Sequence, residues 1–220
     1  MGRKKLERFH FVAQVENVIE RGKEFYTTIQ GRWNELYFKN ANPLVLELAC
    51  GKGEYTLGLA QRFPDKNFIG IDIKGDRIAK GSREALELGL DNVAFLRAGI
   101  KYLDEFFVPQ EISEIWLIHP DPRVREREEN VRLTNPAFLS QYARYLKPGG
   151  IFHLKTDSVF LYEYSLRTLA AHPDYTLLAH TADLYTSPLL EEHHGIVTHY
   201  ERIFVNKGST VHHIKARVEK

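Results

Sequence analysis

The chain has 220 residues, of which 43% are hydrophobic and 27% charged, and its formal net charge is +1. This composition is enough for a folded domain with a sizeable core, and it excludes disorder across the whole chain. A single cysteine, Cys50, excludes an intramolecular disulfide and a cysteine-based zinc site, and it fits a reducing, cytoplasmic compartment. No apolar run approaches the ~20 residues that a membrane-spanning helix needs. The charged N-terminal residues are not followed by the apolar stretch of a signal peptide.

The first forty residues show no regular pattern. Residues 1–20 are polar and are expected to be a flexible basic arm, with Arg3, Lys4, Lys5 and Arg8 as its cluster of cations. Residues 22–38 carry five aromatic side chains and are expected to pack on the edge of the domain, partly as helix.

From residue 43 short apolar runs alternate with longer amphipathic stretches, the order typical of an α/β fold with a doubly wound, mostly parallel sheet. Buried parallel strands are predicted at 44–48, 67–71, 93–97, 115–118 and 151–154, and helices at roughly 54–63, 75–89, 134–146 and 158–171. Further strands are predicted at 174–181, 197–205 and 209–218, with a hairpin turn at 206–208, so that the sheet ends in an antiparallel pair. We expect one domain over residues 1–220, with its core in 43–220.

The segment from Pro43 to Thr56 reads as a strand, a glycine turn and the start of a helix. Gly51 and Gly53 allow a sharp turn and the close approach of a ligand to the backbone. Asp72 follows Gly53 by nineteen residues, at the end of the next predicted strand, where a carboxylate can accept both ribose hydroxyls of an adenosine.

A second carboxylate, Glu47, lies on the first strand, and Thr56 stands where a dinucleotide fold would have its third glycine. Two acids suit a ligand that carries a sulfonium and an ammonium group, so the pattern favours S-adenosylmethionine over NAD. The alternative is a tight strand–helix turn that binds nothing. Cys50 is expected to be a small buried residue of the turn and not a nucleophile.

Five motifs, ELACGKG, GIDIKGDRI, HPDP, KPGGIFHLKTD and THYERIF, occur in an order that resembles the bacterial tRNA (guanine-N7)-methyltransferases. These enzymes modify a guanine in the variable loop of tRNA. The resemblance runs from about residue 44 to residue 217. It implies a Rossmann-like methyltransferase fold with a seven-stranded sheet whose last strand is antiparallel, S-adenosylmethionine as cofactor and tRNA as substrate.

The resemblance and the glycine turn together assign roles to individual residues. Asp121 of HPDP is the expected catalytic carboxylate, and Gly99 would approach the adenine through its backbone. The expected cofactor-binding residues are Glu47, Gly51, Gly53, Asp72, Gly99 and Asp121. The expected substrate-binding residues are Arg125, Asp157, Thr198 and Glu201. The alternatives are that Asp121 is a turn residue before Pro122 and that Thr198 and Glu201 form only a cross-strand polar pair.

The chain departs from the family after PDP. The family continues with Trp-Pro-Lys-Lys-Arg-His, whereas here residues 123–132 mix four arginines with three glutamates and have a net charge of +1. Arg125 stands where the family has a lysine. This segment is either a weaker phosphate contact or a solvated helix face, and the N-terminal cations either bind tRNA phosphates or only solubilise the chain.

Two other functions remain open on the sequence. The protein could methylate a small molecule or a protein, or it could be a catalytically silent RNA-binding relative. His193-His194 and His212-His213 are not expected to bind a metal, because adjacent strand residues point to opposite faces. We expect a monomer or homodimer with no required protein subunit.

Overall fold

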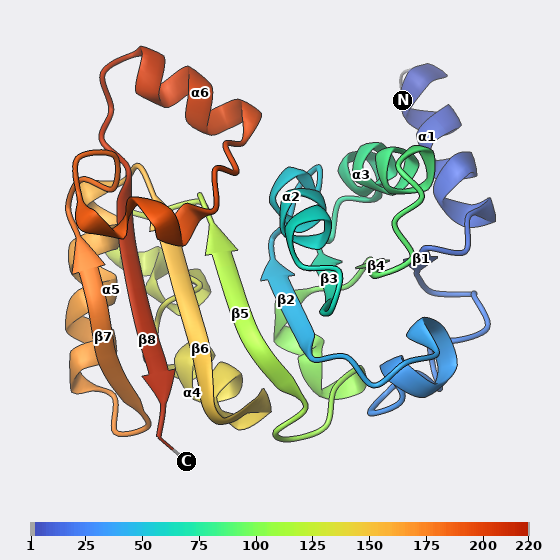
Figure 1. The fold of residues 1–220 in the computed structure, drawn as a ribbon, viewed down its shortest axis with the longest axis horizontal. Coiled ribbons are helices and arrows are strands. Elements are labelled where there is room, and N and C mark those ends of the chain that lie inside the picture. The colour runs from blue at the N-terminus through green and yellow to red at the C-terminus, as the bar shows by residue number, and fades with distance from the viewer. Residues whose placement is uncertain (1–2, 220) are drawn as a thin grey trace. The chain divides into compact units, whose positions relative to one another are not determined.

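The computed structural model describes residues 3–219, which fall into two compact units, Met1–Val108 and Pro109–Lys220 (Figure 1). Among residues 3–219, no helix is both long and apolar enough to cross a bilayer.

The first unit contains four parallel strands in the order β1-β4-β3-β2. They are β1 (Val18–Ile19), β2 (Leu44–Leu48), β3 (Asn67–Ile71) and β4 (Val93–Leu96). All residues of β2, β3 and β4 are buried, as the continuous apolar runs predicted. The connections are helix α2 (Glu54–Arg62), helix α3 (Gly75–Glu87) and, after β4, the 3₁₀ helix η2 (Ile100–Glu105).

The N-terminal segment was expected to be a flexible arm, but residues Arg3–Gln14 form helix α1, which packs against α3. Val12 is fully buried, and the Lys23 ammonium group ends the helix by donating hydrogen bonds of 2.5–2.8 Å to the carbonyls of Val12, Val15 and Val18. The side chains of Arg3 and Lys4 lie outside the described residues.

The aromatic segment forms a short π-helix, η1 (Trp33–Phe38), as the expectation of partial helix allowed. The Trp33 side chain is fully buried and stacks on Phe107, and its indole N–H donates to the carbonyl of Phe106. This aromatic packing joins the segment before β2 to the segment after β4.

The second unit contains four strands in the order β5-β6-β8-β7. They are β5 (Ile112–Ile118), β6 (Leu146–Thr156), β7 (Tyr175–Thr181) and β8 (His212–Val218). β5 and β6 are parallel, and β8 runs antiparallel to both β6 and β7. The helical elements are η3 (Glu126–Val131), α4 (Pro136–Tyr145), α5 (Val159–Ala171), η4 (Pro188–His193) and α6 (His199–Asn206).

The prediction of a strand at 197–205 is wrong, because these residues begin helix α6. Thr198 is its N-cap: the Thr198 hydroxyl accepts from the backbone N–H of Glu201, and the Glu201 carboxylate accepts from the N–H of Thr198. This capping box outweighs the β-branched and aromatic composition that suggested a strand. No hairpin therefore forms at 206–208, and the antiparallel partners of β8 are β6 and β7.

The α/β class with mostly parallel strands and an antiparallel end is confirmed. Among the described residues, β2 to β8 are the seven strands expected of the fold, and the two-residue β1 is additional. That the chain is a single domain stays a prediction.

Candidate functional site

In the first unit, the glycine turn after β2 is built around two left-handed backbone positions. Gly53 has φ +72° and is the N-cap of α2, and a Cβ there would lie 2.5 Å from the Phe95 ring. Gly51 has φ +58° with open space where a side chain would point. The turn thus requires glycine at one position for packing and leaves the backbone open at the other.

Asp72, at the end of β3, is hydrogen-bonded to this turn. One carboxylate oxygen accepts from the N–H of Gly51 at 2.9 Å, and the other accepts from the N–H of Lys74 at 2.8 Å. The sequence predicted that Asp72 lies beside the turn. It did not predict that Asp72 also holds the turn in shape.

Glu47 is buried beneath the start of α2, where its carboxyl group accepts hydrogen bonds from the backbone N–H and the hydroxyl of Thr56. Burial, with a smaller effect of the nearby Asp72 and Glu54, raises the pKa of Glu47 to about 8 against the opposing effect of the Thr56 hydrogen bonds. Glu47 is therefore mostly protonated at neutral pH.

These residues fit a nucleoside ligand that carries positive charge. Gly51 leaves open space for close approach, and the Asp72 carboxylate lies beside the turn, whereas Glu47 is protonated and holds Thr56. Cys50 is buried, and its burial raises the pKa of the thiol well above the ordinary value, so it lacks the thiolate character of a nucleophile. Gly99 is half-buried and precedes η2, with a Cβ position 3.3 Å from the Tyr102 ring.

In the second unit, the HPDP segment follows β5 directly. His119 has φ +44°, and its backbone N–H donates to the carbonyl of Lys155 on β6 at 2.7 Å. The Asp121 side chain is 64% exposed and contacts the Arg123 guanidinium at 3.2 Å. One carboxylate oxygen of Asp121 also accepts a long hydrogen bond, 3.5 Å, from the backbone N–H of Arg123, a contact typical of turns.

A polar cluster gathers beside the carboxyl ends of β5 and β6. The His119 ring lies between the carboxylates of Asp157, 3.2 Å away, and Glu201, 3.5 Å away. Glu201 is fully buried, where it pairs with the Lys155 ammonium at 2.8 Å and accepts from the Tyr185 hydroxyl at 2.8 Å. Of the two carboxylates, only Asp157 is partly exposed, at 27%.

Three members of this cluster, His119, Lys155 and Tyr185, were not predicted as site residues. Burial lowers the pKa of Lys155, while Glu201 raises it. Burial alone would raise the pKa of Glu201, but its contacts with His119, Lys155 and Tyr185 bring it down to about 2. Thr198 and Glu201 are not the cross-strand pair considered as an alternative, because both belong to the start of α6.

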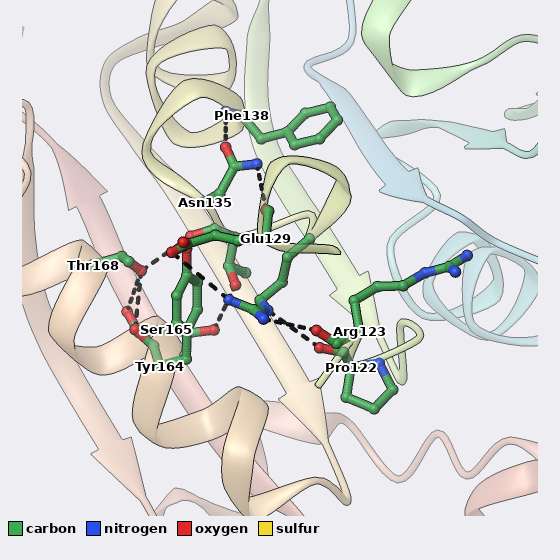
Figure 2. A network of polar contacts seen from close by, with 10 residues as sticks. Pro122, Arg123, Glu129, Asn135, Phe138, Tyr164, Ser165 and Thr168 are labelled. Carbon is green, nitrogen blue, oxygen red and sulfur yellow. Dashed lines mark hydrogen bonds and ion pairs between the residues drawn. The ribbon is translucent and has the colours of Figure 1, made fainter. Parts of the chain in front are cut away.

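The altered segment after PDP is held by Arg132, whose side chain is 3% exposed. Figure 2 shows its contact residues Pro122, Arg123, Glu129 and Tyr164. Its guanidinium donates to the carbonyls of Arg123 at 2.7 Å and Pro122 at 3.3 Å. It also lies over the Tyr164 ring of α5, at 4.1 Å, and contacts Glu129, which accepts from the Tyr164 hydroxyl. Arg132 is therefore a structural cation and not a free phosphate ligand.

The other arginines of this segment differ from Arg132. Arg123, Arg125 and Arg127 are exposed, and Arg125 immediately precedes η3. The interpretation of residues 123–132 as a solvated helix face fits η3, which has no buried residue.

Of the two histidine pairs in the second unit, His193, His212 and His213 are buried and His194 is half-buried. His213 is buried on β8, and its Nε2 is 3.4 Å from Nδ1 of His153, which stacks on Trp116. Burial lowers the pKa of His213 to about 4. His212 packs against the ring of Tyr162.

Solved structures with a similar fold include rRNA methyltransferases. The 16S rRNA methyltransferase KamB has a TM-score of 0.62 at 17% identity, covering 84% of this chain and 92% of its own. An rRNA methylase from Streptococcus thermophilus has a TM-score of 0.55 at 12% identity, covering 81% and 88%. A family model described as a putative methyltransferase matches residues 41–214, so the chain belongs to a methyltransferase family.

Relatives with a curated name show which type of methyltransferase the chain resembles. The tRNA (guanine-N(7)-)-methyltransferase of Cytophaga hutchinsonii is 46% identical over 98% of this chain and 97% of its own length. The protein of the same name from Christiangramia forsetii is 45% identical over the full length of both. The chain belongs to the tRNA (guanine-N(7)-)-methyltransferase family.

Proposed function

We propose that this protein transfers a methyl group from S-adenosylmethionine to N7 of a guanine in tRNA, in the cytoplasm. The observation that carries the proposal is the sequence identity of 46% and 45%, over nearly the full length, to two relatives of that name. The glycine turn supports the choice of cofactor, because its open backbone and the Asp72 carboxylate beside it suit a cationic nucleoside.

The residues that would hold the cofactor are those predicted from the sequence, namely Glu47, Gly51, Gly53, Asp72, Gly99 and Asp121. When bound, S-adenosylmethionine supplies an electrophilic methyl group on a sulfonium. The protein's own residues align the base and exclude water, since guanine N7 has a free lone pair and no proton to remove.

The methylated base is cationic, so carboxylates beside it stabilise the charge that develops during transfer. We assign this role to Asp121, whose exposed carboxylate follows β5, and to Asp157, which follows β6. Thr198 and Glu201 stay predicted substrate-binding residues, and their burial favours a role in orienting Asp157 and helix α6. Exposed Arg125 is the proposed contact to tRNA phosphate.

Incubation of the full chain with labelled S-adenosylmethionine and unmodified bulk tRNA tests the proposal. We expect labelled 7-methylguanosine in the digested tRNA. Methylation of free nucleosides or protein without tRNA would favour a different acceptor, and binding of tRNA with no methylation would favour a silent relative.

Asp121→Ala tests the catalytic assignment in the same assay. We expect a loss of kcat on the order of 10²–10³-fold, because a charge-stabilising group is removed from the transition state. The matched control is Asp91→Ala, another exposed aspartate. Unchanged kcat in Asp121→Ala would exclude the role.

A further inference from the structure

His119 is tied to the polar cluster by its backbone as well as by its ring. Its backbone N–H donates a hydrogen bond to the backbone carbonyl of Lys155, two residues before Asp157. Its φ of +44° is one that residues other than glycine rarely adopt. The side chain is only 7% exposed. The fold thus holds one imidazole ring in one place, between the ends of β5 and β6 and the start of α6.

Both ring nitrogens face carboxylate oxygens. Nδ1 is 3.2 Å from Asp157, within hydrogen-bond distance, and Nε2 is 3.5 Å from Glu201, an ion-pair contact without good hydrogen-bond geometry. A neutral imidazole has a proton on one nitrogen only, so a lone pair on the other would face a carboxylate. Only the imidazolium form suits both neighbours.

The other charged and titratable groups around the ring favour the same form or do not prevent it. On β6, Lys155 opposes a second cation, but it is paired with the other oxygen of Glu201, which also accepts from Tyr185. The hydrogen bond with His119 lowers the pKa of Asp157, and His212 on the neighbouring strand β8 lowers it further. Burial opposes the charge on His119, yet the contacts with Asp157 and Glu201 raise its pKa above the ordinary value of 6.5.

We propose that His119 is a positioning residue which, as an imidazolium between Asp157 and Glu201, holds the Asp157 carboxylate in the orientation that the target guanine requires. This inference rests on the proposed function. Asp157 is the member of the cluster that reaches solvent, whereas Glu201 is sealed inside, so His119 connects an exposed carboxylate to a fixed buried one. Loss of one of the two ring protons leaves one carboxylate facing a lone pair, so the ring no longer connects Asp157 to Glu201.

The reaction makes this role measurable. Because methyl transfer to N7 removes no proton before attack, the chemistry itself gives kcat no proton-transfer step near neutral pH. We expect wild-type kcat to fall as the pH rises through the pKa of His119 in the folded protein, with KM for tRNA nearly constant.

The variant is His119→Asn, whose amide can donate to Asp157 but carries no charge. We expect kcat at pH 7 to fall on the order of 10–100-fold, the effect of a misplaced group, and the alkaline decline to disappear. The matched control is His172→Asn, which removes another buried histidine beside an aspartate, Asp174, at the far end of α5. This control should keep the wild-type pH profile. A wild-type alkaline decline in His119→Asn would overturn the proposal.

An NMR titration of the histidine rings separates this inference from the proposed function. The His119 signal, assigned by its loss in His119→Gln, should show a protonated ring at pH 7, and Asp157→Asn should lower its pKa. A neutral ring at pH 7 would overturn the positioning role whatever the activity. If the wild-type protein forms no 7-methylguanosine, the proposed function fails, while the titration still decides the charge of the ring.

Discussion

Two buried glutamates show how neighbours set the charge of the same side chain. Glu47 has a hydroxyl and an amide as partners, and burial raises its pKa to about 8. Glu201 is buried as well, but its cationic partners bring its pKa to about 2. A buried carboxyl group is therefore protonated in the first unit and ionised in the second at neutral pH.

The raised pKa of Glu47 makes folding pH-dependent. The folded state binds a proton that the unfolded state has lost between about pH 4.5 and 8, so stability falls as the pH rises through this range. We expect Glu47→Gln to remove about 2–3 kcal/mol of the loss between pH 6 and pH 9. Urea unfolding of the ligand-free protein at both pH values measures it.

The control for this prediction is Glu87→Gln, which changes an exposed glutamate at the end of α3. It should show the wild-type pH dependence. If Glu47→Gln lost as much stability as the wild-type protein between pH 6 and pH 9, Glu47 would have an ordinary pKa.

At the scale of elements, the loop between β5 and α4 depends on one arginine. Arg132 makes two backbone hydrogen bonds and lies over an aromatic ring, which a lysine ammonium cannot reproduce together. We expect Arg132→Lys to loosen the segment that carries Asp121 and to lower kcat about tenfold or more, with tRNA affinity changed less than about threefold. Single-turnover kinetics and tRNA titration measure the two effects.

Arg127→Lys is the matched control, since Arg127 is exposed in the same segment. It should leave kcat unchanged. If Arg132→Lys weakened tRNA binding and left kcat intact, Arg132 would instead be a phosphate contact.

The central strands and helices could be predicted from the sequence, because buried strands separated by amphipathic helices have a strong pattern. Helix α6 could have been found from the T-x-x-E spacing of Thr198 and Glu201, a capping-box signal that the strand-like composition concealed. The His119 cluster could not be predicted. Asp157 and Glu201 are 38 and 82 positions from His119, and they meet it only through the pairing of β5 with β6 and the return of α6.

At the scale of the whole molecule, the near-neutral charge limits how tRNA is attracted. The net charge is +1, and Arg132 is buried by its own interactions, so the phosphate-binding cations must come from elsewhere. Helix α1 carries Lys5 and Arg8 on exposed positions. The expected basic arm is therefore a candidate phosphate contact with a helical frame.

We expect the double variant Lys5→Gln and Arg8→Gln to weaken tRNA binding and to reduce the slope of log affinity against log salt by about 1–2. Binding releases about one counterion for each phosphate that the protein contacts, so fewer counterions are released when contacts are lost. Binding measured between low and moderate salt gives the slope. The control pair, Lys39→Gln and Arg62→Gln, lies before β2 and at the end of α2 and should not change it. An unchanged slope in the first pair would mean that these cations only solubilise the chain.

The buried Cys50 has a practical consequence. It is the only cysteine in the chain, and it lies in the turn between β2 and α2 that Asp72 closes. A thiol reagent can therefore modify this protein at one atom only, and only when the turn opens. The rate of that modification measures how often the turn opens locally, and no label has to be introduced.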